Sequence, residues 1–292
     1  MILIIVSGCS NSEKSTEEYL SYVSSIQQWH QNRIENLKKN TLSSVGRSRL
    51  KDGENSFGSH DSNDIVFPKD RSPEFIGSFY LQNGEVTVKI DPDVEVLNKG
   101  ELVREMKMTN DQGGDQTNLH LRSLRWYIMK REDEISVRLH DSESPYLDEF
   151  KGIETYPIDT AWRIKAQFEP HMQIKIIETT TASGAMRRLS SPGALGFRIK
   201  DKYFRLDVMP LNSDNFILLF GDETSGIETY DGGRFLVVEK PGERGITIMD
   251  FNKATNPPCA LNKYYSCPLP TPQNILPIKV TAGEKKYQND AH

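Results

Sequence analysis

The chain has 292 residues, enough for one large domain or two modest domains with a sizeable hydrophobic core. Its hydrophobic content of 36 % is typical of a water-soluble globular protein. The formal net charge of −5, with lysine and arginine spread along the chain, argues against nucleic acid as a partner.

The N-terminus combines a short apolar run with an early cysteine. Residues 1–6 are all apolar, but a bilayer span needs about 20 such residues. The following VSGC, which ends at Cys9, resembles the lipobox of bacterial lipoproteins, in which the cysteine is lipidated and becomes the mature N-terminus. We therefore interpret residues 1–14 as a signal-peptide remnant and tether that anchors the protein to a membrane surface of the cell envelope. The alternative is a short buried strand, since isoleucine and valine favour strands.

Residues 15–40 contain the first predicted element, an amphipathic helix over residues 15–39. Ser15 and Glu18 have the spacing of a capping box. Apolar and aromatic residues recur at intervals of three and four and define one helix face: Tyr19, Tyr22, Val23, Ile26, Trp29, Ile34 and Leu37.

After residue 51 the hydrophobic pattern has a period of two, which predicts strands. EVTVKI places Val86, Val88 and Ile90 on one strand face. Hairpins are predicted within residues 123–141, 196–208 and 235–251, with turns near 131–133, at 201–202 and over 241–245 respectively. FILLFGD, which ends at residue 222, has the continuous apolar run of a strand buried on both faces.

The order of these elements predicts a mainly β protein. An N-terminal amphipathic helix is followed by two β-rich, sandwich-like or barrel-like halves, and no alternation of strands with helices indicates a parallel sheet. We place the first half at residues 41–150 as a β-sandwich-like domain. The second half, residues 151–292, ends in a closing loop rich in cysteine and proline.

Several segments resemble a known bacterial family. They are GENSFGSHDSNDIVFP from residue 53, LHDSESPYLDEFKGIETYPID, GDETSGIETYDGGRFL, and MDFNKATNPPCALNKYYSCPLPTPQNILPIKVTAGEK over 249–285. They are similar to the family catalogued as domain of unknown function 1684, many of whose members are lipoproteins. The resemblance extends from about Trp29 to Lys285. It implies an architecture and a location in the cell, without a reaction.

A second resemblance concerns the first half only. FGSHDSNDIVFP followed by RSPEFIGSF is similar to the opening of forkhead-associated domains, which are β-sandwiches that bind phosphothreonine. That family places an arginine after the glycine and a histidine after a serine, whereas this chain has Ser59 and Phe75 there. A phosphate clamp needs a guanidinium or equivalent donors, so the sequence argues against phosphopeptide binding. Asn63 and Asp64 are expected to shape a turn instead.

Two loops of the second half carry candidate chemistry. In the loop over residues 222–234, backbone amides with Thr229 and Arg234 could cradle an anion, and Asp222 adds a carboxylate. The alternative is a long hairpin loop whose glycines permit a positive φ.

The second loop, over residues 250–256, concentrates polar side chains. Asp250 and Lys253 are weak candidates for acid–base catalysis, as is Asp222 of the first loop. Asn252 and Asn256 are candidate ligand-binding residues. Equally, these side chains could hold a proline-bearing loop in shape through hydrogen bonds to backbone amides.

The remaining cysteines, Cys259 and Cys267, lie eight positions apart in NPPCALNKYYSCPLP. That spacing fits neither a zinc knuckle nor a C-x-x-C redox motif, and the histidines show no metal-binding pattern, so we predict no metal and no cofactor. If Cys9 is lipidated, the count of remaining thiols is even, and export permits a disulfide between them. Packed free thiols and a functional thiol stay open as alternatives.

Three functions remain in view. The first is a membrane-tethered binding or structural module that presents loops to a small ligand, a glycan or an envelope protein. The second is a hydrolase that uses acidic and amide residues of the 222–234 and 250–256 loops. The third is a thiol redox protein, which predicts an exposed thiolate of low pKa at Cys259 or Cys267.

Overall fold

The structure is a computed structural model that describes residues 10–131, 134–182 and 184–287. The chain divides into two compact units. The sandwich unit is Asn36–Lys151, and the barrel unit comprises the described residues of Met1–Glu35 and Gly152–His292. Cys9 lies outside the described residues.

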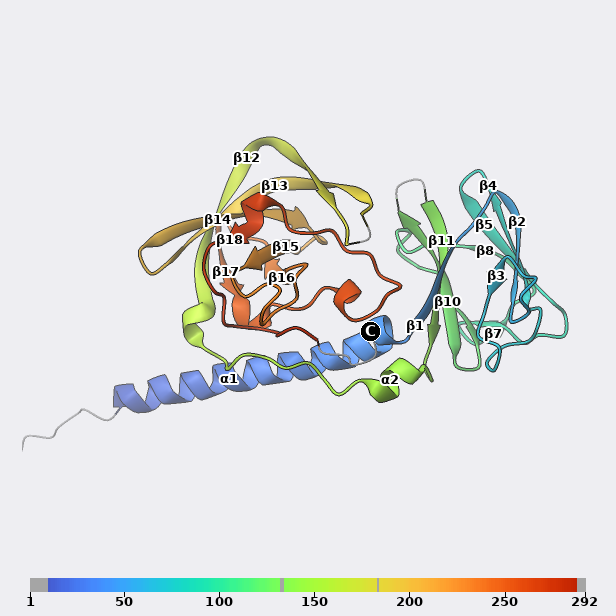
Figure 1. Ribbon diagram of the computed structural model, residues 1–292, viewed down its shortest axis with the longest axis horizontal. Coiled ribbons are helices and arrows are strands. Elements are labelled where there is room, and N and C mark those ends of the chain that lie inside the picture. The colour runs from blue at the N-terminus through green and yellow to red at the C-terminus, as the bar shows by residue number, and fades with distance from the viewer. Residues whose placement is uncertain (1–9, 132–133, 183, 288–292) are drawn as a thin grey trace, which may run out of the picture. The chain divides into compact units, whose positions relative to one another are not determined.

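The sandwich unit contains two mostly antiparallel sheets (Figure 1). One sheet has the order β1 (Ser44–Arg49), β11 (Glu134–Asp141), β10 (Leu124–Arg131), β9 (Leu119–Leu121), β6 (Leu97–Asn98) and β7 (Glu101–Leu102). The other has the order β3 (Ile65–Val66), β2 (Gly53–Gly58), β4 (Gly77–Gln82), β5 (Glu85–Ile90) and β8 (Glu105–Met108). A π-helical turn, η1 (Lys38–Leu42), and a short helix, α2 (Pro145–Glu149), complete the unit.

Aromatic side chains fill the core between these two sheets. Phe57 of β2 stacks on Phe79 of β4 with ring centroids 4.3 Å apart, and Trp126 of β10 meets Phe67 edge-on at 5.3 Å. Burial alternates along β5, where Val86, Val88 and Ile90 face inward as predicted. The inward-facing side chains of the two sheets form one continuous hydrophobic core.

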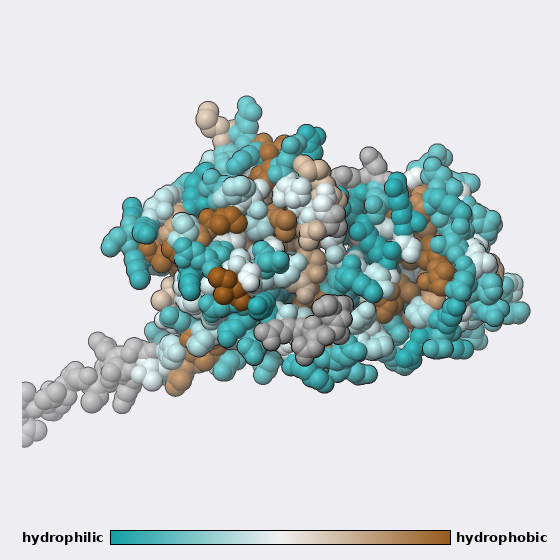
Figure 2. Space-filling view, in the orientation of Figure 1, coloured by the Kyte–Doolittle hydropathy of each residue, from teal (hydrophilic) through white to brown (hydrophobic). Residues whose placement is uncertain are grey.

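The barrel unit is built on a nearly closed, barrel-like sheet. Its strand order is β16 (Arg234–Glu239), β15 (Asn215–Asp222), β14 (Lys202–Pro210), β13 (Met186–Ile199), β12 (Arg163–Thr180) and β17 (Ile246–Asp250), and β18 (Ile275–Leu276) pairs with β15. Four 3₁₀ turns accompany it: η2 (Thr160–Trp162), η3 (Phe251–Lys253), η4 (Pro258–Ala260) and η5 (Pro272–Asn274). On the face seen in Figure 2, hydrophilic side chains dominate this unit, and hydrophobic ones form small separate patches.

The long helix α1 (Ser10–Leu37) runs along the barrel unit as one continuous helix (Figure 1). It starts five residues earlier than predicted and ends at Leu37, directly before η1. The predicted apolar face is buried only in part, because Ile26 is buried whereas Tyr19 is 45 % exposed. Within the described part of the chain, no helix combines the length and apolar character that crossing a bilayer requires.

The predicted fold class is confirmed, since the protein is mainly β with an N-terminal helix. The hairpins β10–β11 and β13–β14 form as predicted, the latter turning at Lys200–Asp201. The third predicted hairpin is wrong: β17 pairs with β12, and β16 pairs with β15. β16 and β17 are instead the two ends of the sheet, joined by a hydrogen bond of 2.8 Å from Thr247 Oγ1 to the Glu239 carbonyl.

Candidate functional site

Helix α1 meets the barrel unit through polar contacts that begin at Tyr22. The Tyr22 hydroxyl lies 3.0 and 2.9 Å from the two carboxylate oxygens of Asp250, to which it donates. Asn252 Nδ2 donates to the same hydroxyl at 3.0 Å and to the Asp159 carbonyl at 2.8 Å. Burial, followed by the negative charge of Asp250, raises the pKa of Tyr22 well above its usual range. Tyr22 therefore stays a neutral donor that ties the helix to η3.

Two turns further along, the same helix face carries His30 and Arg33. His30 bonds the backbone of Asn252, and its burial lowers the pKa of its imidazole. Arg33 Nη2 donates to the Asn256 carbonyl at 3.1 Å, and Arg33 Nε lies 3.4 Å from Glu284 Oε1. Because these residues recur at helical spacing from Tyr22, α1 is held along several turns by hydrogen bonds to the end of β17 and the segment after it.

Glu284 links the helix to the end of the described chain. Its side chain is 1 % exposed, it accepts from the Asn256 backbone N–H at 2.6 Å, and it pairs with Arg33. Asn256 Nδ2 donates in turn to the Lys285 carbonyl at 2.7 Å. Burial raises the pKa of Glu284, opposed by the charge of Arg33. The Glu284 carboxylate thus binds Arg33 of α1 and the backbone of Asn256 at the same time. It therefore holds α1 and the segment around residue 284 against Asn256.

A second buried network surrounds Arg234 and Asp222. Arg234 Nη2 donates to Asp222 Oδ2 at 2.7 Å and to the Val280 carbonyl at 2.9 Å. Thr224 Oγ1 donates to Asp222 Oδ1 at 2.6 Å and lies 2.8 Å from Thr229 Oγ1. These groups are all buried, so the network clamps the segment near residue 280 onto the β15–β16 loop. Gly226 and Gly233 in that loop take φ of 80°, as a hairpin loop with glycine turns requires.

The structure places the predicted site residues in these two networks, which meet where Arg234 Nη1 donates to the Glu284 carbonyl at 3.4 Å. Asp222, Thr229 and Arg234 lie in one, and Asp250, Asn252 and Asn256 lie in the other. Lys253 is the exception, with its ammonium 6.0 Å from the ring centroid of Trp29 on α1. None of the seven is among the lining residues of the two cavities described below. Their hydrogen bonds shape loops and dock α1, which was the alternative interpretation from sequence.

The cavity of the barrel unit opens beside Tyr22, along the N-terminal half of α1. It has a volume of about 960 Å³ and is lined by Glu17, Glu18, Tyr19, Ser21, Tyr22, Ser25, Thr160 and Arg163. The guanidinium of Arg163 lies 5.7 Å from the ring centroid of Tyr22. Aromatic rings, hydroxyls, two acids and one cation thus face one hollow. Sequence analysis missed this site because Tyr19 and Tyr22 fit the apolar stripe of an ordinary amphipathic helix.

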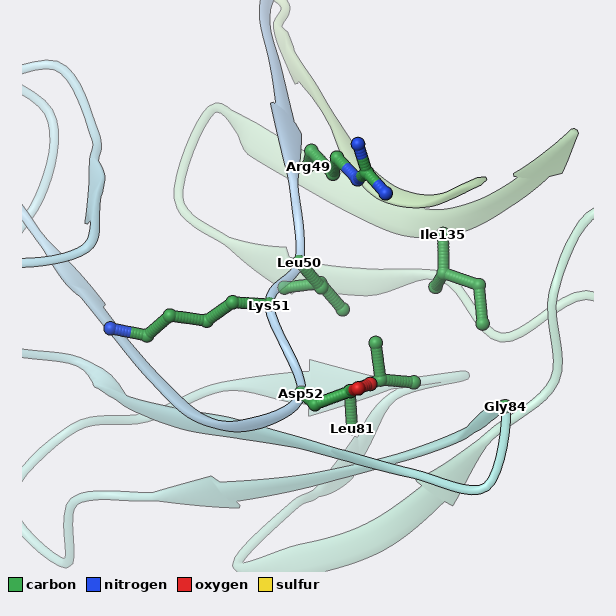
Figure 3. A pocket seen from close by; sticks show the side chains of 7 residues that line it. All are labelled: Arg49, Leu50, Lys51, Asp52, Leu81, Gly84 and Ile135. Atoms are coloured by element: carbon green, nitrogen blue, oxygen red, sulfur yellow. The ribbon is translucent and has the colours of Figure 1, made fainter. Parts of the chain in front are cut away.

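A smaller cavity of about 500 Å³ lies in the sandwich unit, lined by Arg49, Leu50, Lys51, Asp52, Leu81, Gly84 and Ile135. Figure 3 shows the apolar side chains of Leu50, Leu81 and Ile135 around it, while Lys51 extends away from it. Lys51 is paired instead with Asp64. The hollow therefore combines apolar side chains of the sandwich unit with the charged residues Arg49 and Asp52.

The turn of the sandwich unit that resembles a forkhead-associated domain is shaped as predicted. Asn63 Nδ2 donates to the carbonyls of His60 and Glu74, at 2.9 and 2.8 Å. Asp64 accepts from the Ser56 backbone N–H at 2.9 Å. Both side chains are thereby used to fix backbone.

Cys259 and Cys267 are free thiols in the structure, so the bridge that the even count favoured is not formed in it. They nevertheless touch, because the Cys259 backbone N–H donates to Cys267 Sγ at 3.3 Å. Within the described residues, no group of three or more His, Cys, Asp or Glu side chains is arranged to hold a metal ion.

Residues 148–285 match the model of a family described as "Protein of unknown function (DUF1684)". This segment is a DUF1684 domain. The prediction of this family is thereby confirmed, over a shorter stretch than the sequence resemblance covered. The DUF1684 segment contains the network around Arg234, the thiol pair, the residues that α1 contacts between Asp250 and Glu284, and two lining residues of the α1 cavity, Thr160 and Arg163.

Comparison with solved structures adds two neighbours. The solution structure of an uncharacterised protein of Haloarcula marismortui is 28 % identical, with 50 % of this chain and 80 % of that chain covered and a TM-score of 0.41. A forkhead-associated domain described for phosphothreonine-dependent interactions is 10 % identical, with 33 % and 95 % covered and a TM-score of 0.23. Both TM-scores are too low for either structure to support a conclusion about this chain. No curated protein matches it.

Proposed function

We propose that this protein is a lipid-anchored module of the bacterial cell envelope that holds a ligand-binding groove along α1. One observation carries the proposal: the helix that begins at Ser10, directly after Cys9, also forms a wall of the 960 Å³ cavity. An anchor at Cys9 would therefore keep that cavity close to the membrane surface. The polar contacts of Tyr22 and Arg33 hold α1 on the barrel unit, so the anchor would also keep the barrel unit near the membrane surface.

The lining of the cavity favours a polyhydroxylated ligand, such as a glycan of the envelope. Tyr19 and Tyr22 offer flat aromatic faces to the C–H side of a sugar ring, and Ser21, Ser25 and Thr160 offer hydroxyls. Glu17 and Glu18 accept hydrogen bonds from sugar hydroxyls. The same two carboxylates disfavour both apolar and strongly anionic ligands.

A binding titration with neutral oligosaccharides, followed by nuclear magnetic resonance or calorimetry, tests this groove. We expect Tyr19→Ala to weaken binding about tenfold, since loss of one stacked aromatic face costs on the order of 1 kcal/mol or more. Leu20→Ala is the matched control: Leu20 is the next helical residue, is 60 % exposed, and lies outside the cavity lining. Equal affinities of the two variants, or no binding of any oligosaccharide by the wild type, would contradict the glycan assignment.

The hydrolase alternative gains no support from this geometry. Asp222 and Asp250 are buried, and their carboxylates already accept hydrogen bonds from Arg234 and Tyr22. A general acid or base needs a reacting group within hydrogen-bond reach, and neither carboxylate is a lining residue of the α1 cavity or of the sandwich-unit cavity.

A further inference from the structure

The loop that closes the DUF1684 domain holds two thiols in contact. Cys259 lies in η4 and is half-buried, whereas Cys267 is 7 % exposed. The two side chains are hydrogen-bonded to one another, in addition to the bond from the Cys259 N–H to Cys267 Sγ at 3.3 Å. The sulfur atoms are therefore within reach of each other without movement of distant parts of the chain.

Anchors on both sides hold this contact in place. Before Cys259, the Asn256 backbone N–H is bound by the buried carboxylate of Glu284 at 2.6 Å. After Cys267, the Leu269 backbone N–H donates to the Thr180 carbonyl at 2.9 Å. Because both ends of the loop are tied to the barrel unit, the two sulfurs stay close in the reduced state.

The surroundings make the two thiols chemically unequal. The Cys267 thiol and, as a lesser contribution, the Tyr230 hydroxyl donate to Cys259 Sγ, and these bonds lower the pKa of Cys259 against the opposing effect of burial. The hydrogen bond to Cys259, together with burial, raises the pKa of Cys267 far above its usual range. Cys259 is thus the more acidic and the more accessible thiol of the pair.

We propose that Cys259 and Cys267 form a reversible dithiol–disulfide site, with Cys259 as the attacking thiol and Cys267 as the resolving thiol. The oxidant is a disulfide, RSSR, of a small molecule or of another protein. The Cys259 thiolate attacks one sulfur of RSSR, which forms a mixed disulfide and expels the thiolate RS⁻. Cys267 gives its proton to RS⁻, and its sulfur attacks Cys259 Sγ and expels a second RS⁻, which is protonated by solvent. The cysteines lose two electrons, and RSSR becomes two RSH.

This site is independent of the proposed anchor and groove, because none of the residues near the thiols lines the α1 cavity. It also gives Tyr230 a role that the sequence did not indicate. The hydroxyl of Tyr230 is expected to stabilise the Cys259 thiolate as a hydrogen-bond donor.

Mass spectrometry of the full chain after incubation with oxidised glutathione tests the site. The mass is read on the peptides that contain Cys259 and Cys267, because the full chain also carries Cys9. We expect these two cysteines of the wild type to lose two hydrogen atoms and both thiols, and to regain them with reduced glutathione. Cys267→Ser should accumulate a glutathione adduct at Cys259, whereas Cys259→Ser should leave Cys267 unmodified. Retention of both thiols by the wild type, or equally fast adduct formation in the two single variants, would overturn the assignment of roles. Cys267→Ala serves as the alternative if the serine variant does not fold.

The rate of alkylation of Cys259 against pH tests the contribution of Tyr230. In the Cys267→Ser background, Tyr230→Phe should move the midpoint of this profile to higher pH and slow alkylation at pH 7 about threefold to tenfold. Tyr203→Phe is the control, because Tyr203 bonds Glu169 on the β12–β14 surface and not a cysteine. An unchanged profile in Tyr230→Phe would show that Tyr230 does not act on this thiol.

Discussion

His140 of the sandwich unit shows how strongly one buried side chain can couple stability to pH. It is 3 % exposed, and its Nδ1 lies 2.9 Å from Ser43 Oγ. The Ser43 hydroxyl donates its proton to the Lys39 carbonyl at 2.7 Å, so His140 Nδ1–H must be the donor to Ser43. Among the described residues, Nε2 of His140 has no hydrogen-bond partner. A second proton would therefore be placed on a buried atom without an acceptor.

Burial first, and the charges of Arg125 and Arg138 next, lower the pKa of His140 from 6.5 to about 3. His140 therefore takes up a proton near pH 6.5 in the unfolded chain but only near pH 3 in the folded unit. The stability that depends on neutral His140 is fully present above pH 6.5. It is lost as the pH falls from 6.5 towards 3.

We expect the sandwich unit to lose about 2–3 kcal/mol of unfolding free energy between pH 6.5 and 4.5 through His140. His140→Asn keeps a side-chain donor for Ser43 and removes the titration, so its stability should be flatter over this range. Hydrogen exchange of the β11 amides at the two pH values measures the difference. Parallel pH dependences of wild type and variant would show that another group is responsible.

Among the contacts that dock helix α1, one is a buried ion pair. Arg33 is the cation that faces the buried carboxylate of Glu284. Removal of one partner of a buried ion pair leaves an uncompensated charge, which costs about 3 kcal/mol or more. Replacement of both partners by neutral groups costs much less.

We therefore expect Arg33→Met to lower the unfolding free energy of the barrel unit by about 3 kcal/mol. Glu284→Gln in the same chain should restore most of that loss, because no buried charge then remains unpaired. Urea denaturation of the wild type, the two single variants and the double variant gives the coupling energy. Additive effects of the two substitutions would show that the pair does not hold α1.

The elements also show what could be predicted from the sequence. Alternation and turn residues were sufficient for β5 and for the hairpins β10–β11 and β13–β14, because strand and turn are encoded locally. The partner of β17 was not predictable in this way, since its pairing with β12 depends on closure of a sheet across more than 60 residues.

The candidate site was less predictable for a related reason. Polar residues such as Asp250 and Asn252 look alike whether they bind a ligand or a helix from the other end of the chain. Only the fold shows that Tyr22, 228 residues away from Asp250 along the chain, is the partner. The cysteines were the opposite case: their proximity was expected from sequence, but the difference in acidity depends on Tyr230 and on burial.

At the scale of the whole molecule, the two units have separate hydrophobic cores, and the DUF1684 domain falls within the second half of the chain. The proposed anchor precedes α1, and α1 contributes to the barrel unit both a docking face and a wall of the cavity. The sandwich unit contributes no residue to the α1 cavity. The proposal thus assigns attachment and ligand binding to the helix and barrel unit together.

Mass spectrometry of the N-terminal peptide, from protein purified out of its native membranes, tests the proposed lipid anchor. We expect a mature chain that begins at Cys9 and carries acyl chains, and we expect Cys9→Ser to lose its attachment to the membrane. A chain that retains Met1 with an unmodified Cys9 would contradict the lipid anchor and the proposed location of the groove.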